Sequence, residues 1–162
     1  MTTETREITE ASLGVAHDLG HGGAYSEYRI RRTGDGYEVS VVVGRRYPRP
    51  GENGFRPREV RESLRKEGRE AAGFLERLAL EHRVFELGDS PCPSVFLHPT
   101  FYRFNFTDSR GAGHGFEYSV EARRHHSNAH RRLVEDFEEF FESGRASHSF
   151  YERVERPWWR FW

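Results

Sequence analysis

The sequence predicts an α+β domain with a four-stranded antiparallel sheet and two long helices on one face, in the order ββαββα. Two segments, 28–43 and 102–122, alternate apolar and polar residues around glycine-containing turns, which is typical of β-hairpins with one buried face. Each hairpin is followed by a segment with apolar residues every three or four positions, which indicates an amphipathic helix. Packing both helices on the apolar face of the sheet is the simplest way to build one core.

The length of 162 residues suits a single domain, because a chain of this size buries a large share of its apolar surface in one core. We divide it into an N-terminal segment (1–23), a first hairpin-plus-helix unit (24–88), a second unit (94–144) and a C-terminal tail (145–162). A short helix near Ile8 to Leu19 is expected in the N-terminal segment.

The first hairpin is centred on the turn Thr33-Gly34-Asp35-Gly36. Tyr28 and Ile30 precede this turn, and the apolar residues after it occupy alternate positions: Tyr37, Val39, Val41 and Val43. The helix of the same unit is expected to run from Pro57 to Gly88, after an irregular linker over residues 44–58. Its apolar stripe consists of Val60, Leu64, Gly68, Ala71, Leu75, Leu78, His82 and Phe85.

The second hairpin has a longer, glycine-rich loop over residues 108–115, flanked by alternating apolar residues: Tyr102, Phe104, Phe106, Phe116, Tyr118 and Val120. Its helix is capped by Ser127 or Asn128 and ends at Ser143-Gly144. The string Gly36-Tyr37-Glu38-Val39 has the same pattern as Gly115-Phe116-Glu117-Tyr118. The two units are therefore either a tandem duplication or two half-buried hairpins that look alike.

Composition limits the classes of function. The net charge is −1, so the whole molecule does not attract nucleic acid or anionic lipid non-specifically. Cys92 is the only cysteine, which excludes an intramolecular disulfide and a zinc site built from cysteines. No cationic leader and no apolar run of about 20 residues is found in the sequence, so we expect a cytoplasmic protein without a membrane span. Nothing in the sequence calls for a cofactor.

The C-terminal string Arg156-Pro157-Trp158-Trp159-Arg160-Phe161-Trp162 contains all 3 Trp of the chain. Exposed aromatic surface favours association, and Trp and Arg are common hot-spot residues of interfaces. The tail packs either against its own domain or against another subunit or protein. Because no catalytic constellation is found in the sequence, we expect a non-enzymatic protein-binding or assembly module that uses Trp158, Trp159, Phe161 and Trp162 to bind a protein partner or to form a homo-oligomer.

An alternative function rests on the one clearly basic segment, residues 44–58. Its arginines are interleaved with Tyr47 and Phe55, and they are Arg45, Arg46, Arg49, Arg56 and Arg58. Arginines interleaved with aromatic residues can bind phosphates while the rings stack on bases, so nucleic acid or another anionic ligand is the alternative partner. The same pattern is also found in solvated connections between elements.

The string His17-Asp18-Leu19-Gly20-His21 resembles the metal-binding step of the HD-domain phosphohydrolases. The resemblance implies a divalent metal at His17 and Asp18 that activates water for phosphoester hydrolysis. His17 and His21 also have the spacing of two zinc ligands on a helix. The chain departs from the family, because no histidine precedes His17 and the overall pattern is α+β instead of all-helical. Three nearby glycines, Gly20, Gly22 and Gly23, disfavour a continuous helix at this point.

A second histidine cluster begins at His125, and within it His126 and His130 could approach a metal together. The four arginines of the same stretch would repel a dication and suit a phosphate or carboxylate better: Arg123, Arg124, Arg131 and Arg132. A metal-dependent hydrolase that uses either histidine set is the third function considered.

Overall fold

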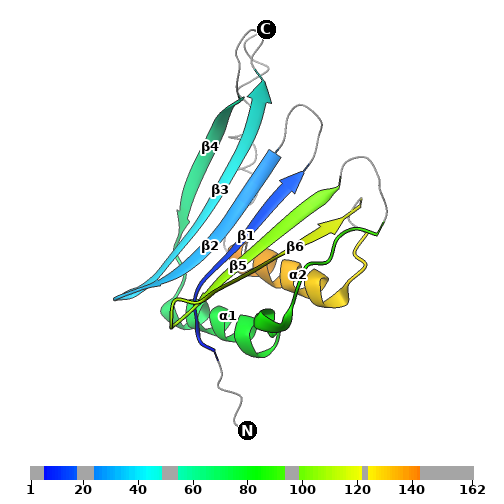
Figure 1. The fold of residues 1–162 in the computed structure, drawn as a ribbon. Coiled ribbons are helices and arrows are strands. Elements are labelled where there is room, and N and C mark those ends of the chain that lie inside the picture. Colours follow the sequence, from blue (N-terminus) through cyan, green and yellow to red (C-terminus); the bar gives the residue numbers. More distant parts are fainter. Residues whose placement is uncertain (1–5, 18–23, 49–54, 94–98, 122–123, 143–162) are drawn as a thin grey trace.

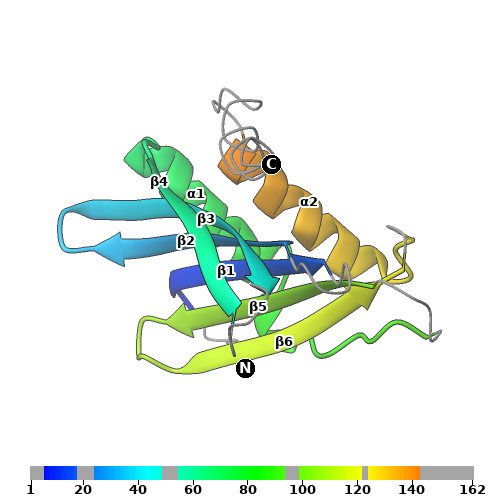
Figure 2. The ribbon, with the colours of Figure 1, turned by 90° about the horizontal axis from the view of Figure 1, so that it is seen from above.

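The computed structural model describes residues 6–17, 24–48, 55–93, 99–121 and 124–142. They form a six-stranded antiparallel sheet with two α-helices on one of its faces (Figures 1 and 2). The strands are β1 (Ile8–His17), β2 (Ala24–Thr33), β3 (Gly36–Pro48), β4 (Phe55–Leu64), β5 (Thr100–Asp108) and β6 (Gly113–Val120). The helices are α1 (Gly68–Leu80) and α2 (Asn128–Glu142), and a 3-10 turn, η1 (Val84–Glu86), follows α1.

The order across the sheet is β4-β3-β2-β1-β5-β6, and every neighbouring pair is antiparallel. The predicted four-stranded sheet and the order ββαββα are therefore wrong. β1 and β4 are additional strands, and the elements follow one another as ββββαββα. Because β4 stands between the first hairpin and its helix, the chain is also not a simple tandem repeat of ββα units.

β1 replaces the predicted N-terminal helix. Its register against β5 shifts between Ile8 and Glu10, and Ile8 and Ala11 are both buried in the core. A bulge of this kind places two residues three positions apart on one face, which imitates a helical pattern. After the bulge the strand alternates regularly, with Ala11 and Leu13 fully buried. Pairing with β2 on one edge and β5 on the other holds the strand in the middle of the sheet.

β4 replaces the predicted linker and the start of the first predicted helix. Pro57 lies opposite Arg46 in this strand at the edge of the sheet, where proline is tolerated because its missing N–H can face outward. Val60 and Leu64 are four residues apart, which fits a helix as well as alternate positions of a strand. The pairing with β3 makes this segment a strand, and α1 is consequently much shorter than predicted.

The core lies between the sheet and the helices and is rich in phenylalanine. Phe74 of α1 stacks on Phe140 of α2 with ring centroids 4.1 Å apart, and Phe137 of α2 meets Phe104 of β5 at 5.8 Å. These contacts hold both helices against the same face, and no described helix covers the opposite face (Figure 2). In the part of the chain that the structure describes, neither helix has the length and apolar character needed to cross a membrane.

Candidate binding site

The helix-free face of the sheet carries a trough along β1. Three small residues, Ser12, Gly14 and Ala16, occupy alternate positions of this strand. Their register partners on β2 and β5 are larger: Arg29 and Asn105 beside Ser12, Glu27 and Arg103 beside Gly14, and Tyr25 and Phe101 beside Ala16. All of these partners except Arg29 line the hollow and form its two walls. The resulting hollow has a volume of about 630 Å³, which lies within the usual size range of ligand sites.

The floor of the trough is open space. A Cβ added at Gly14 would have the Arg103 carbonyl oxygen at 3.8 Å and the Arg103 Cβ at 4.0 Å as its nearest neighbours, and both are ordinary contacts. Glycine inside a strand weakens the strand and often marks a place where another group approaches closely. Packing against the residues that the structure describes does not require glycine at this position, and none of their side chains fills the space above it.

The two aromatic residues at one end of the trough lie differently. The ring of Tyr25 covers Gly44 on β3, where an added Cβ would lie only 2.8 Å from Tyr25 Cε1. Tyr25 therefore leans away from β1 and leaves the floor uncovered. Phe101, on the opposite wall, is 44% exposed. An exposed phenylalanine beside a hollow offers apolar surface that a partner can bury.

The two arginines along the trough have carboxylate partners within the chain, whereas Glu27 has no such partner among the described residues. Arg103 donates from Nε and Nη2 to Glu117 Oε1 at 2.9 and 2.6 Å, and Arg29 donates to Glu10 Oε1 at 2.8 and 2.5 Å. Glu27 is exposed and has no hydrogen bond or ion pair with another side chain that the structure describes. The trough thus presents one carboxylate that favours a cationic group in its ligand.

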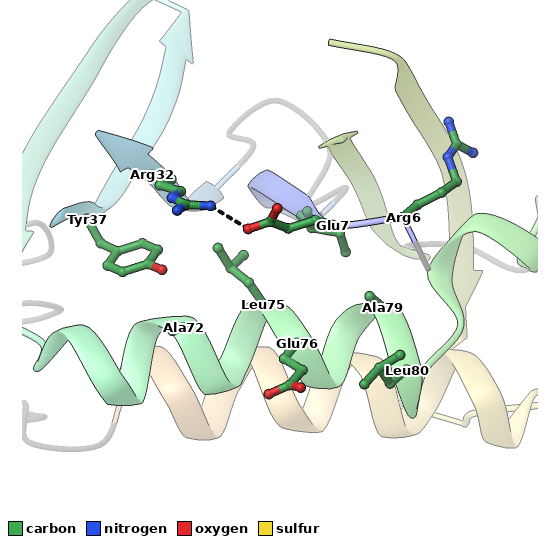
Figure 3. A pocket seen from close by; sticks show the side chains of 10 residues that line it. Arg6, Glu7, Arg32, Tyr37, Ala72, Leu75, Glu76, Ala79 and Leu80 are labelled. Atoms are coloured by element: carbon green, nitrogen blue, oxygen red, sulfur yellow. Dashed lines mark hydrogen bonds and ion pairs between the residues drawn. The ribbon is translucent and has the colours of Figure 1, made fainter. Parts of the chain in front are cut away.

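A second hollow, of about 300 Å³, lies between α1 and the ends of β1, β2 and β3 (Figure 3). Five residues of α1 line its helical side, and Leu75 points toward the strands in Figure 3: Ala72, Leu75, Glu76, Ala79 and Leu80. Among its charged residues, Arg32 forms an ion pair with Glu7, and Arg6 lies 2.9 Å from Asp108. Because these charges satisfy each other within the chain, this hollow offers a ligand less than the trough does.

The arginines of the predicted anion-binding segment lie on the hairpin of β3 and β4. Pairing of the two strands places Arg45 directly opposite Arg58 and sets Arg46 and Arg56 at adjacent register positions. Arg49 lies outside the described residues. Four of the five arginines are therefore gathered at one end of the sheet, which the sequence reading of an irregular linker did not foresee.

The first histidine set does not have the geometry that its spacing suggested. His17 is the last residue of β1, so it belongs to a strand and not to a helix. Asp18 and His21 lie outside the described residues. Within the described ranges, no group of three or more His, Cys, Asp or Glu residues is placed to hold a metal ion.

The second histidine set packs around the buried ring of Tyr118. His130 donates from Nε2 to the Gly88 carbonyl at 2.9 Å, and its Nδ1 lies 2.7 Å from the Ser127 hydroxyl. The Tyr118 hydroxyl lies 3.0 Å from Nδ1 of His125. Burial raises the pKa of Tyr118 and lowers the pKa of His125. These hydrogen-bonded groups form a structural network that ties α2 and the residues before it to β6.

His126 is exposed and is also engaged within the chain, because its Nε2 lies 3.0 Å from the Ser90 hydroxyl. His126 and His130 thus each have partners of their own and do not converge on one point. Trp158, Trp159, Phe161 and Trp162 of the tail lie outside the described residues.

The sequence reading missed the trough because it assigned β1 to a helix. The signal was present in the alternation of Ser12, Gly14 and Ala16 with the apolar Leu13 and Val15. This alternation indicates a trough only if β1 is a central strand with larger residues on both neighbouring strands. No family model matches this chain, and no curated protein or solved structure shows a significant similarity to it.

Proposed function

We propose that this chain is a non-enzymatic assembly module in which the aromatic C-terminal segment of one copy, residues 156–162, binds in the trough of another copy. The observation that carries the proposal is the open floor at Gly14 between two larger walls, with the exposed ring of Phe101 at one end. A solvent-exposed hollow that combines apolar surface with an unneutralised carboxylate, Glu27, suits a ligand that combines aromatic rings with a cation.

The C-terminal segment has these complementary groups. It contains 3 Trp, Phe161, and the cations Arg156 and Arg160. The walls on β2 and β5 are two strand spacings apart, about 10 Å, which accommodates one aromatic ring above the floor. A Trp ring on Gly14 and Ala16 would bury apolar surface against Phe101, and a neighbouring arginine would reach the Glu27 carboxylate.

The geometry of the chain favours binding to a second copy. α2 ends at Glu142 on the helix-covered side of the sheet, whereas the trough is on the opposite face. Residues 143–155 extend to about 45 Å at most, so binding within one chain would require a path around the sheet edge. Binding to another copy has no such constraint.

Intrinsic tryptophan fluorescence tests the proposal directly, because all 3 Trp belong to the C-terminal segment. At high concentration we expect short-wavelength emission from buried indoles and a mass above that of a chain lacking residues 157–162. Dilution should move the emission to longer wavelength as the mass falls. Short-wavelength emission that persists in a diluted monomer would show the tail packed on its own chain and would overturn the assembly role.

A matched pair of variants locates the binding surface. Gly14→Leu places a side chain on the trough floor, where an added Cβ meets only ordinary contacts. Gly34→Leu is the control, since Gly34 lies in the β2–β3 turn with nothing within 4 Å of an added Cβ. We expect Gly14→Leu to lose the tail-dependent association while Gly34→Leu retains it, with circular dichroism verifying that both are folded. Full association of a folded Gly14→Leu chain would exclude the trough.

A second candidate function, binding of nucleic acid or another anion, is favoured by the position of Arg45 opposite Arg58. Like charges placed directly opposite each other on a sheet are destabilising, and a bound phosphate would relieve this repulsion. Its test is the affinity for a single-stranded oligonucleotide as a function of salt. The double change of Arg45 and Arg58 to Ala should weaken binding and reduce the salt dependence if this function is correct.

A further inference from the structure

The two outer edges of the sheet differ. Beside β6, the Ser90 N–H donates to the Glu117 carbonyl at 2.8 Å, and the Ser119 N–H donates to the Ser90 carbonyl at 3.2 Å. Ser90 thereby covers the part of this edge beside Tyr118. Beside β4, no segment that the structure describes pairs with the outer edge. An open edge of ten residues is a template for another strand.

We propose that β4 pairs with β4 of a second copy around a two-fold axis at Val60, which joins the two sheets into one continuous antiparallel sheet. The outer edge of β4 is not part of the trough, so the inference does not rest on the proposed function. A homodimer with the same patch on both copies is the commonest form of symmetric association.

The direction of the β4 main-chain groups follows from the sheet pairing. Thr33 and Gly36 close the two-residue turn of the β2–β3 hairpin, which makes them a hydrogen-bonded pair. Hydrogen-bonded pairs alternate along each strand, so the even-numbered residues of β3 bond to β2 and the odd-numbered ones bond to β4. The N–H groups of Glu59, Arg61 and Ser63 on β4 therefore point to the outer edge. Pro57, which lacks an N–H, falls in this outward set, as expected for proline in an edge strand.

The sequence of charged residues along β4 favours one position of the two-fold axis. In antiparallel pairing an outward residue faces an outward residue, so the two-fold axis passes through a residue position. An axis at Arg58, Glu59, Arg61 or Glu62 would set that charge opposite its own copy. An axis at Val60 instead places Glu59 opposite Arg61 and Arg58 opposite Glu62 on both sides. In the middle of the strand, only this register sets every charge opposite an opposite charge.

The same register suits the neighbouring strand. Within one chain Arg58 and Arg45 are register partners, and the partner's Glu62 would be the register neighbour of Arg58 on its other side. Val60, which packs partly against the core, would meet the partner's Val60 and extend the apolar layer. Glu59 and Arg61 face the uncharged Gly44 and Val42 on β3, so exchanging their charges disturbs no register partner within the chain.

Site-directed crosslinking tests the register. At an axis through Val60 the two Cα atoms form a non-hydrogen-bonded pair about 4.5 Å apart, which is within the range of a disulfide. In a Cys92→Ser background, Val60→Cys should give a crosslinked dimer under mild oxidation. Ser63→Cys should not, because its two copies would be about 20 Å apart. Equal crosslinking at both positions, or none at 60, would overturn the proposal.

A charge exchange provides the second test, read by sedimentation equilibrium on the chain lacking residues 157–162. Arg61→Glu sets two carboxylates opposite each other at two symmetric places and should raise the dimer dissociation constant roughly tenfold. The double variant Glu59→Arg/Arg61→Glu restores opposite charges and should regain the dimer. If the double variant is as weak as the single one, the register is wrong. Because this chain lacks the aromatic segment, failure of the proposed function leaves these results unchanged.

Discussion

Asp136 on α2 accepts two hydrogen bonds from Arg77 on α1, with Nη2 2.9 Å from Oδ1 and Nε 3.3 Å from Oδ2. His82, which follows α1, lies 2.9 Å from Oδ2 of the same carboxylate. The Asp136 side chain is 15% exposed and that of Arg77 is 39% exposed, so this contact between the helices is partly shielded from water. One carboxylate therefore joins the two helices and the segment after α1.

Replacing Asp136 by Asn keeps the shape of the side chain and removes its charge. We expect the free energy of unfolding in urea to fall by roughly 1–3 kcal/mol, because Arg77 loses a charged acceptor in a partly buried place. Glu135→Gln is a suitable control, since Glu135 is exposed and its partner Arg131 is 3.6 Å away. The control should change stability by less than about 0.5 kcal/mol. Similar losses in both variants would contradict the role given to Asp136.

The same carboxylate makes stability depend on pH. Burial alone would raise the pKa of Asp136, but the hydrogen bonds from His82 and Arg77 outweigh it and hold the pKa below its ordinary value. Its stabilisation is therefore complete above the unfolded pKa of about 4 and is lost as the pH falls through the lower folded pKa. The difference in unfolding free energy between the native chain and Asp136→Asn should be constant near pH 7 and shrink below pH ~4. A difference that stays constant into acid would refute this linkage.

His125 adds a second pH dependence at higher pH. Burial lowers the pKa of this imidazole, and its Nδ1 lies within hydrogen-bond distance of the Tyr118 hydroxyl, 3.0 Å away. A lowered folded pKa means that the unfolded chain takes up a proton first, so stability declines as the pH falls below about 6.5. His125→Asn should remove this part of the decline in urea unfolding between pH 7 and 5. An identical pH profile for the variant would assign the decline to other groups.

The sequence predicts local pairing better than it predicts the sheet. Alternation identifies the β2–β3 and β5–β6 hairpins because each strand has one buried face, as Tyr28 and Phe104 illustrate. β1 escapes this pattern because the bulge near Glu10 interrupts the alternation. β4 escapes it because Val60 and Leu64 also have helical spacing, and only long-range pairing with β3 decides between the two structures.

The candidate site could not be predicted for the same reason. The trough needs β2 on one side of β1 and β5 on the other, although β1 and β5 are separated by more than 80 residues in the chain. No local pattern around Gly14 carries this information. Similarly, the arginines of the basic segment were visible in the sequence, whereas the pairing of Arg45 with Arg58 follows only from the existence of β4.

Gly14 and Gly44 provide a final prediction, because alanine should have opposite effects at the two positions. An added Cβ at Gly14 meets only ordinary contacts, so Gly14→Ala should raise the free energy of unfolding by roughly 0.5–1 kcal/mol through reduced chain entropy. An added Cβ at Gly44 would overlap the Tyr25 ring, so Gly44→Ala should lower it by roughly 1–3 kcal/mol.

The combined change Gly44→Ala/Tyr25→Ala separates this overlap from other causes. If the ring is the obstacle, the loss caused by Gly44→Ala should be much smaller in a Tyr25→Ala background, and the two changes should be strongly non-additive in a double-mutant cycle. Additive losses would mean that Tyr25 does not lie over Gly44 in solution. In that case the ring would be free to cover Ala16, and the trough floor would lose the opening on which its binding role depends.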